Sequence, residues 1–280
     1  MKRVLLLIDV SYQAYRAAAA HPLLKDSDDN FTGGLYGFWQ SLAKAIRETG
    51  ASDLAACLDV MPYVRSRDYP EYKLLRGTAG NEELRERQKF SLPLILESLR
   101  SVGLEPWGVP GFECDDLIGW VVRQHRHRFD HIYAQSNDSD LYQLFDVAPN
   151  FSVYATDLAN VWDARRLRED LNITGAEYML ATALMGTHND IAGIRGVGIK
   201  TAIKAVKDPA LMRGYRVQYG DMIDRNLGLI KLPHPELPHL VLPSRTPASA
   251  RSLYKSLGRY DIEVTANMVA AVDQIQVRKT

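Results

Sequence analysis

The sequence has few of the features that mark several protein classes. Its 280 residues include only two cysteines, Cys57 and Cys114, and neither belongs to a CxxC pair. Neither a disulfide framework nor a cysteine-based zinc site is therefore predicted. The longest apolar run near the start, Val4 to Ile8, ends at Asp9 and is too short for a membrane span or a secretory signal. We therefore expect a cytoplasmic protein that does not engage a membrane.

An excess of charge of one sign is also missing, because 34 lysines and arginines balance 34 aspartates and glutamates. This balance excludes a uniformly basic protein that coats nucleic acid, but it leaves room for local segregation of charge. Internal repeats and low-complexity tracts are absent as well. The length and the 46% hydrophobic content fit one large globular domain or two small ones.

Three short apolar segments each lead to an aspartate. Val4–Ile8 precedes Asp9, Leu54–Leu58 precedes Asp59, and residues 131–134 come shortly before Asp138. Segments of helical period lie between and after them, at 35–47, 92–99 and 117–128. Alternating strands and helices predict a parallel, doubly wound α/β sheet, whose ligands bind at the carboxyl ends of the strands. The sequence thus places an acid at the end of each predicted strand, where a ligand would bind.

More acids follow at the same predicted edge. Glu113, Asp115 and Asp116 begin a helix, and Asp138 and Asp140 lie just beyond a strand. Each pattern taken alone also fits a helix cap or favourable helix-dipole charges. Seven acids at one edge, however, would repel each other unless cations lay between them. An oxygen-only ligand set favours Mg²⁺ or Mn²⁺, and two such ions can activate water for phosphoryl displacement.

The balance of charge is consistent with an acidic pocket on a basic body. Setting eight acids aside leaves 26 acids against 34 bases, a surplus of eight positive charges. The eight are Asp9, Asp59, Glu113, Asp115, Asp116, Asp138, Asp140 and Asp190. A basic body around a metal pocket suits a polyanionic substrate.

Two further segments stand out, one dense in charges of both signs and the other rich in glycine and followed by lysines. Residues 68–90 fit either a solvated helix or a mobile basic element over the active site. Farther on, Gly193–Thr201 lies between predicted helices at 176–185 and 202–207. Gly196 and Gly198 would let the backbone approach a phosphate, and Lys200, Lys204 and Lys207 would share one helix face. A last helix is expected near 265–274.

The chain resembles the 5′ nuclease family, which includes phage flap endonucleases and the small domain of bacterial DNA polymerase I. The resemblance runs from about residue 4 to 210 through motifs in the family's order. Leu7-Ile8-Asp9, Tyr15-Arg16-Ala17 and Thr32–Phe38 resemble the opening strand, the YRA segment and the TGAxYGF helix start. Four later segments resemble PEYKxxR, GxEADD with Cys114 in place of alanine, DxDLxQL and GVxGIGxKTA, namely Pro70–Arg76, Gly111–Asp116, Asp138–Leu144 and Gly193–Ala202.

The resemblance implies a PIN-like α/β domain over 1–175 with a helical arch at about 68–92. A helix–three-turn–helix region would follow at 176–225, and residues 226–280 would pack on the body. The implied activity is Mg²⁺- or Mn²⁺-dependent phosphodiester hydrolysis near the 5′ end of DNA flaps or duplexes, as in replication or repair. The implied partners are DNA with a free 5′ end, an RNA primer and a DNA polymerase in trans, with the protein itself a monomer.

The resemblance also implies roles for single residues. The eight acids listed above would surround two metal ions, while Lys73 and Arg76 would stabilise the scissile phosphate. A monovalent cation at the hairpin is a further option of the family. DNA would contact three sets of residues. Tyr72 would stack on a base, unless it merely packs in the protein, and a free 5′ strand would thread beneath Arg85, Arg87 and Lys89. The third set is Gly196, Gly198, Lys200, Thr201 and Lys204.

The sequence departs from the family at the GDxxDN motif before the hairpin. Here the chain has Gly186-Thr187-His188-Asn189-Asp190, so at least one acid is missing. Because affinity follows ligand charge, we expect a weaker second metal site that needs more Mg²⁺ or prefers Mn²⁺. Two other functions stay open at this point: a non-catalytic DNA-structure-binding protein with a degenerate metal site, and a PIN-type endoribonuclease.

Overall fold

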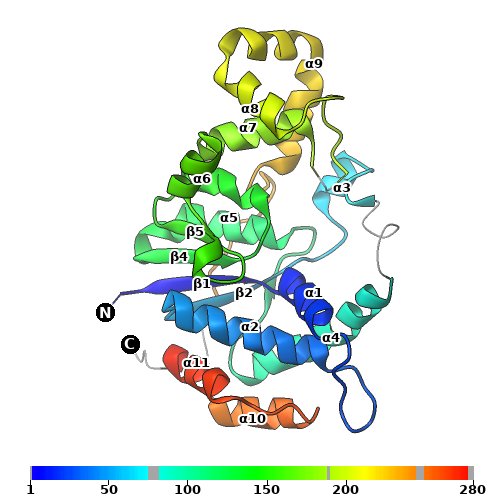
Figure 1. Ribbon diagram of the computed structural model, residues 1–280, viewed down its shortest axis with the longest axis vertical. Coiled ribbons are helices and arrows are strands. Elements are labelled where there is room, and N and C mark those ends of the chain that lie inside the picture. The colour runs from blue at the N-terminus through cyan, green and yellow to red at the C-terminus, as the bar shows by residue number, and fades with distance from the viewer. Residues whose placement is uncertain (1, 75–81, 188–189, 244–248, 277–280) are drawn as a thin grey trace.

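The computed structural model describes residues 2–74, 82–187, 190–243 and 249–276. Its centre is a six-stranded sheet in the order β3-β2-β1-β4-β5-β6 (Figure 1). The strands are β1 (Val4–Asp9), β2 (Asp53–Leu58), β3 (Trp107–Gly108), β4 (His131–Gln135), β5 (Phe151–Tyr154) and β6 (Val161–Trp162). All neighbours are parallel except β5 and β6. The predicted strands at 4–8, 54–58 and 131–134 are therefore confirmed.

The sheet is buried on both faces, because successive apolar side chains of its central strands point to opposite sides of it. Leu6 and Ile8 of β1 point into one core with α1 (Val10–Ala20), α2 (Gly33–Thr49) and α4 (Glu82–Ser101). Leu5 and Leu7 point into a second core with α5 (Cys114–His125). Because helices cover both faces, side chains on both sides of a central strand are buried, and such parallel strands therefore have continuous apolar sequences. The expected doubly wound α/β architecture is the observed one.

The helices confirm most of the sequence-based boundaries and extend one of them. The pattern at 92–99 predicts a short helix, but α4 runs 20 residues from Glu82 and includes Pro93. Its first turns fall within the charge-dense segment at 68–90, where a solvated helix was one of two interpretations. Between α4 and the short α3 (Val64–Asp68), part of the expected arch lies outside the described residues.

A helical extension stands at one end of the molecule (top of Figure 1). It consists of α7 (Gly175–Met185), α8 (Ile199–Lys207) and α9 (Pro209–Ile230), which share a third apolar core. The short α6 (Ala164–Leu171) precedes it. Helix α9 crosses residue 225, where the region implied by the resemblance would end.

The last two helices pack at the opposite end of the molecule, below α2 and α4 in Figure 1. These are α10 (Ala250–Gly258) and α11 (Ala266–Gln276), and their apolar residues Leu253, Leu257, Met268 and Val272 join the core that holds α2. Within the described ranges, no helix combines the length and apolarity needed to cross a bilayer.

Candidate active site

The acids expected at the sheet edge come from four adjacent elements. Asp9 ends β1, Asp59 follows β2, Asp138 follows β4, and Asp115 lies in the first turn of α5. Because β1, β2 and β4 are parallel neighbours, their carboxyl ends meet. The strand order also reverses at β1, which makes this edge the topological switch point where α/β sheets bind ligands.

Short hydrogen bonds to neighbouring groups orient two of these carboxylates. Asp9 accepts from the Tyr12 backbone N–H at 3.0 Å and from the Ser136 hydroxyl at 3.0 Å. Asp59 accepts from the backbone N–H of Cys114 at 2.9 Å, which ties the end of β2 to the start of α5. Sequence analysis missed Ser136, whose only signal was its position directly after a strand.

The loop after β4 brings in two more acids. Asp138 caps the 3₁₀ helix Ser139–Leu144 by accepting from the backbone N–H of Asp140 at 2.8 Å. Asp140 is the second residue of this helix, and its half-buried carboxylate is repelled by Asp138 and Glu113.

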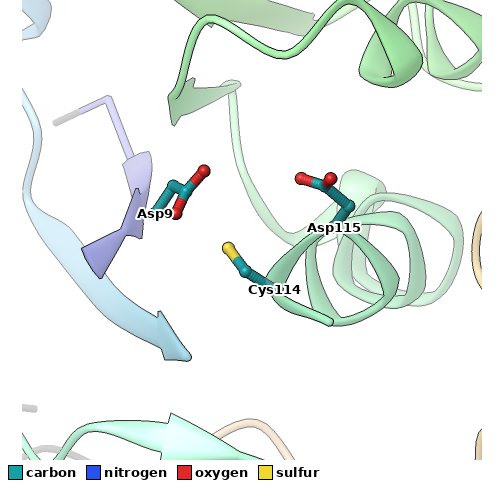
Figure 2. A group of neighbouring side chains, drawn as sticks. All are labelled: Asp9, Cys114 and Asp115. Carbon is teal, nitrogen blue, oxygen red and sulfur yellow. The ribbon is translucent and has the colours of Figure 1, made fainter. Parts of the chain in front are cut away.

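Asp9, Cys114 and Asp115 form a group of three potential metal ligands in the described part of the chain (Figure 2). One ligand atom from each lies within 4.8 Å of the others. Figure 2 shows the Asp9 carboxylate and the Cys114 sulfur facing each other across the gap between β1 and α5, with Asp115 beside them. Oδ1 of Asp115 is buried and has no hydrogen-bond partner among the described residues.

The pKa values at the site reflect burial and mutual repulsion. Burial, then repulsion from Asp59, raises the pKa of Asp9 to about 7. Burial, then repulsion from Asp138, raises the pKa of Asp140 to about 8 and holds the pKa of Asp115 well above its ordinary value. Ionised carboxylates are therefore costly here unless a cation compensates them. Together with the unpartnered oxygen of Asp115, this makes the donor set fit a divalent metal ion.

Asp116 lies apart from this group, contrary to the expectation that it would surround the metals. Its carboxylate is fully buried and accepts from the Arg65 guanidinium at 2.6 and 2.8 Å and from the backbone N–H of His234 at 2.7 Å. Since these donors already engage both oxygens, Asp116 neutralises a buried arginine. Sequence analysis missed Arg65, which lies 51 residues away from Asp116 in a charge-dense segment.

Glu113 connects that arginine to the predicted catalytic lysine. Its Oε2 accepts from Arg65 at 2.9 Å and from the Tyr72 hydroxyl at 2.7 Å, and its Oε1 contacts the ammonium of Lys73. Lys73 is half-buried beside the acids, and its charge offsets part of the rise in the pKa of Asp115 and Asp140. Tyr72 is 6% exposed, so its ring packs in the protein interior. Arg76 lies outside the described residues.

The basic residues expected in the arch lie in the first turns of α4. Arg87 pairs with Glu83 and stacks on Phe31, and Lys89 pairs with Glu86 at 2.6 Å. Arg85 is half-exposed on the same helix. These pairs are surface ion pairs that a polyanion could replace at little cost.

The loop between α7 and α8 brings the predicted hairpin residues to an exposed end of α8. Gly196 has a φ of 82°, and Gly198 precedes the helix with open space around its α-carbon. Lys200, Thr201 and Lys204 are exposed on α8. Asp190 lies inside this loop with a φ of 62°, between residues joined by the Gly186–Ala192 bridge, and His188 lies outside the described residues.

Comparisons with known proteins agree with this geometry. Residues 4–172 match the family model described as the N-terminal, resolvase-like domain of 5′-3′ exonucleases. DNA polymerase I of Treponema pallidum is 31% identical over 72% of this chain, which covers 20% of that protein. The 5′-3′ exonuclease of Aquifex aeolicus is 29% identical over 73% of this chain and 69% of its own length. The chain thus spans about a fifth to a quarter of the polymerase relatives it matches.

Solved structures share the fold. The T5 D15 protein crystallised with metal ions superposes with a TM-score of 0.66 at 17% identity and covers 98% of both chains. Flap endonuclease-1 of Methanococcus jannaschii superposes with a TM-score of 0.65 at 15% identity, over 98% of this chain and 92% of the other. The PIN-like fold is therefore confirmed, whereas the helix–three-turn–helix stays a prediction. With most of its length matched by the family model, the chain belongs to the 5′ nuclease family.

Proposed function

We propose that this protein is a structure-specific 5′ nuclease that hydrolyses phosphodiester bonds near the 5′ end of DNA flaps and duplexes. The observation that carries the proposal is the mutually repelling group of buried Asp9 and half-buried Asp59, Asp115, Asp138 and Asp140, with one buried carboxylate oxygen that has no hydrogen-bond partner among the described residues. Family membership supports the same reaction.

These five acids would hold two divalent ions, Mg²⁺ or Mn²⁺. When bound, such ions lower the pKa of a water molecule and stabilise the charge on the displaced oxygen. Glu113 would lie beside the ions without coordinating them directly, because its oxygens already bind Lys73, Tyr72 and Arg65. Asp190 would add a ligand only if its loop turned towards the sheet. The missing acid of the GDxxDN motif supports a weaker second ion and a demand for more Mg²⁺.

Lys73 is the proposed catalytic residue within the described chain. Its ammonium is held by Glu113 and flanked by the Tyr63 and Tyr72 rings at 5.1 and 5.4 Å. A cation fixed beside the acids is placed to stabilise the extra charge that a phosphate gains in the transition state. Arg76 is proposed to stabilise the same charge, and this proposal rests only on its position in the motif.

The DNA would lie across the exposed start of α8 and under the arch. Backbone N–H groups after Gly198 and the charges of Lys200 and Lys204 would hold duplex phosphates without reading sequence. A T5 D15 flap endonuclease with this fold has been crystallised with DNA and metal ions, which supports DNA as a partner. An RNA primer as the 5′ strand, a polymerase acting in trans, a monomeric state and action in the cytoplasm remain part of the proposal.

The test is cleavage of a 5′-labelled flap in Mg²⁺ by three proteins. Wild type should cut, Asp138→Ala should lose at least about 100-fold in rate, and Asp170→Asn should cut like wild type because Asp170 is a surface residue of α6 paired with Arg166. Tight flap binding without cleavage by any of the three would select a non-catalytic binding protein. Cleavage of single-stranded RNA alone would select an endoribonuclease.

Threading of the 5′ strand has a separate test. If the strand passes beneath the first turns of α4, which carry Arg85, Arg87 and Lys89, a bulky protein attached to the 5′ end before mixing should abolish cleavage. The same block added after the flap has bound should not. Equal cleavage of blocked and free flaps would contradict threading.

A further inference from the structure

Cys114 occupies the position where the family motif has alanine, and its side chain lies inside the acidic group. It is 2% exposed and begins α5, so the helix start fixes its direction. Figure 2 shows its sulfur directed at the Asp9 carboxylate. One atom each of Asp9, Cys114 and Asp115 lie within 4.8 Å of one another. A group of this composition differs chemically from the oxygen-only set that the sequence pattern predicts.

The difference matters because the affinity of a metal ion for a ligand depends on how soft, or polarisable, the ligand atom is. Mg²⁺ and Mn²⁺ favour oxygen, whereas Zn²⁺ and its heavier congener Cd²⁺ bind thiolate sulfur strongly. A zinc ion lies about 2.3 Å from a thiolate sulfur and about 2.0–2.2 Å from a carboxylate oxygen, which keeps tetrahedral ligand atoms about 3.5 Å apart. Shifts of about 1 Å would bring the three ligand atoms to that spacing.

The surroundings leave these atoms available. Oδ1 of Asp115 is buried without a partner among the described residues, and so is directed at a group that they do not supply. Asp9 keeps one hydrogen bond on each oxygen, which leaves a lone pair on each. The Cys114 thiol contacts the thiol of Cys57, which is a weak hydrogen-bond partner.

We propose that Asp9, Cys114 and Asp115 form a binding site for a thiophilic divalent cation of the Zn²⁺ class, which overlaps the Mg²⁺ site and competes with it. On binding, the Cys114 thiol releases its proton to solvent and the sulfur donates a lone pair to the ion, with no change in oxidation state. Traces of such an ion would then inhibit a reaction that needs Mg²⁺. The site exists whether or not the nuclease proposal holds, because it needs no DNA.

The experiment is titration of the metal-free full chain with Cd²⁺ alone, followed through the ultraviolet sulfur-to-cadmium charge-transfer band. Wild type should develop the band at one equivalent. The band should vanish in Cys114→Ala and Cys114→Ser, persist in Cys57→Ala, and need at least about tenfold more Cd²⁺ in Asp115→Asn. Alanine is the family's own residue at 114, so this variant should fold, and circular dichroism checks it.

Several results would overturn the proposal. A wild-type protein with no band, a band that survives in both Cys114 variants, or a band lost in Cys57→Ala would each remove Cys114 as the ligand. Competition separates this site from the nuclease proposal: Mg²⁺ should raise the Cd²⁺ midpoint in wild type even if the protein cleaves no flap. A midpoint independent of Mg²⁺ would refute the overlap of the two sites.

Discussion

At the scale of the residue, the buried oxygen of Asp115 without a described partner is the clearest sign that the site suits a cation. A buried carboxylate among other carboxylates is destabilising when it ionises, and folding tolerates it only for a function that needs the charge. Asparagine has nearly the same shape and no charge. It therefore separates the electrostatic cost of this group from its packing.

We predict that Asp115→Asn stabilises the metal-free protein at pH 8 while abolishing metal-dependent cleavage. Relief of repulsion worth about 1 kcal/mol would raise the melting temperature by about 2–4 °C, and cleavage should fall by at least about 100-fold. Differential scanning calorimetry in EDTA and the flap assay measure the two effects. A variant that melts below wild type in EDTA would contradict the electrostatic interpretation.

Tyr72 allows a second prediction at this scale, because stacking on a base and packing in the core need different parts of the side chain. Phenylalanine keeps the ring but loses the 2.7 Å hydrogen bond to Glu113. Since Tyr72 is 6% exposed, we expect Tyr72→Phe to lower the free energy of unfolding by about 1–2 kcal/mol and to leave flap affinity nearly unchanged. Urea unfolding and fluorescence anisotropy are the measurements. Unchanged stability would favour a role at the DNA.

At the scale of the element, Arg65 joins three parts of the chain. It lies on α3, binds Glu113 and Asp116 at the start of α5, and donates to the carbonyls of Leu229 and Lys231 at the end of α9. The helical extension that would hold DNA is therefore anchored to the helix that carries Asp115. Breaking a buried ion pair by removing one partner is far more costly than breaking an exposed one.

We predict that Arg65→Met lowers the free energy of unfolding by about 3–5 kcal/mol, because two buried carboxylates lose their counter-charge. Arg67→Met is the matched control. Arg67 lies two residues away, is 59% exposed and pairs with Asp68 and Glu236, so its loss should cost far less than the loss of Arg65. Urea unfolding compares the two. Similar losses in both variants would mean that the Arg65 network contributes little.

The Arg65 network also marks the limit of what the sequence could predict. Strand ends were predictable because an apolar run followed by an acid is a local pattern, and Asp9, Asp59 and Asp138 all lie where that pattern placed them. Asp116 belongs to the same local pattern as Asp115, yet the two point to different partners. Only the distant Arg65 distinguishes them, and no local signal separates a buried arginine from its exposed neighbour Arg67.

The loop between α7 and α8 gives a prediction about glycine. A β-carbon at Gly193 would lie 2.2 Å from the carbonyl oxygen of Met185, whereas one at Gly198 would meet nothing within 4 Å. Gly193→Ala should therefore distort the loop and weaken both stability and duplex binding. Gly198→Ala should leave the melting temperature unchanged and weaken binding only if a phosphate approaches its α-carbon. Calorimetry and anisotropy at matched salt check both variants. Equal melting temperatures for the two variants would contradict the steric argument.

At the scale of the whole molecule, a rigid scaffold holds the repelling acids together. Apolar cores on both faces of the sheet fix the strand ends, and α10 and α11 extend one of these cores. The stability of the scaffold offsets the repulsion at its edge. The balance between the two should depend on pH and on divalent ions.

We predict that, without metal, the raised pKa values of the site acids make the protein less stable as pH rises from about 4 to about 8. Across this window folded Asp9, with a pKa of about 7, and folded Asp140, with a pKa of about 8, keep protons that the unfolded chain has released. Half-buried His131 and buried His234 have lowered pKa values and act in the opposite direction near pH 6. The slope must therefore be compared with that of Asp9→Asn and Asp140→Asn. Both variants should lose part of the decline.

Mg²⁺ should reverse this trend because it binds the ionised carboxylates and the folded state alone presents them together. The rise in melting temperature at saturating Mg²⁺ should be larger at pH 8 than at pH 5, where protons compete with the metal. In Asp115→Asn the rise should shrink at both pH values. Scanning calorimetry across pH, in EDTA and in Mg²⁺, measures the full set. An equal effect of Mg²⁺ at pH 5 and pH 8 would mean that the acids at the sheet edge are already ionised without it, and that the metal is held elsewhere.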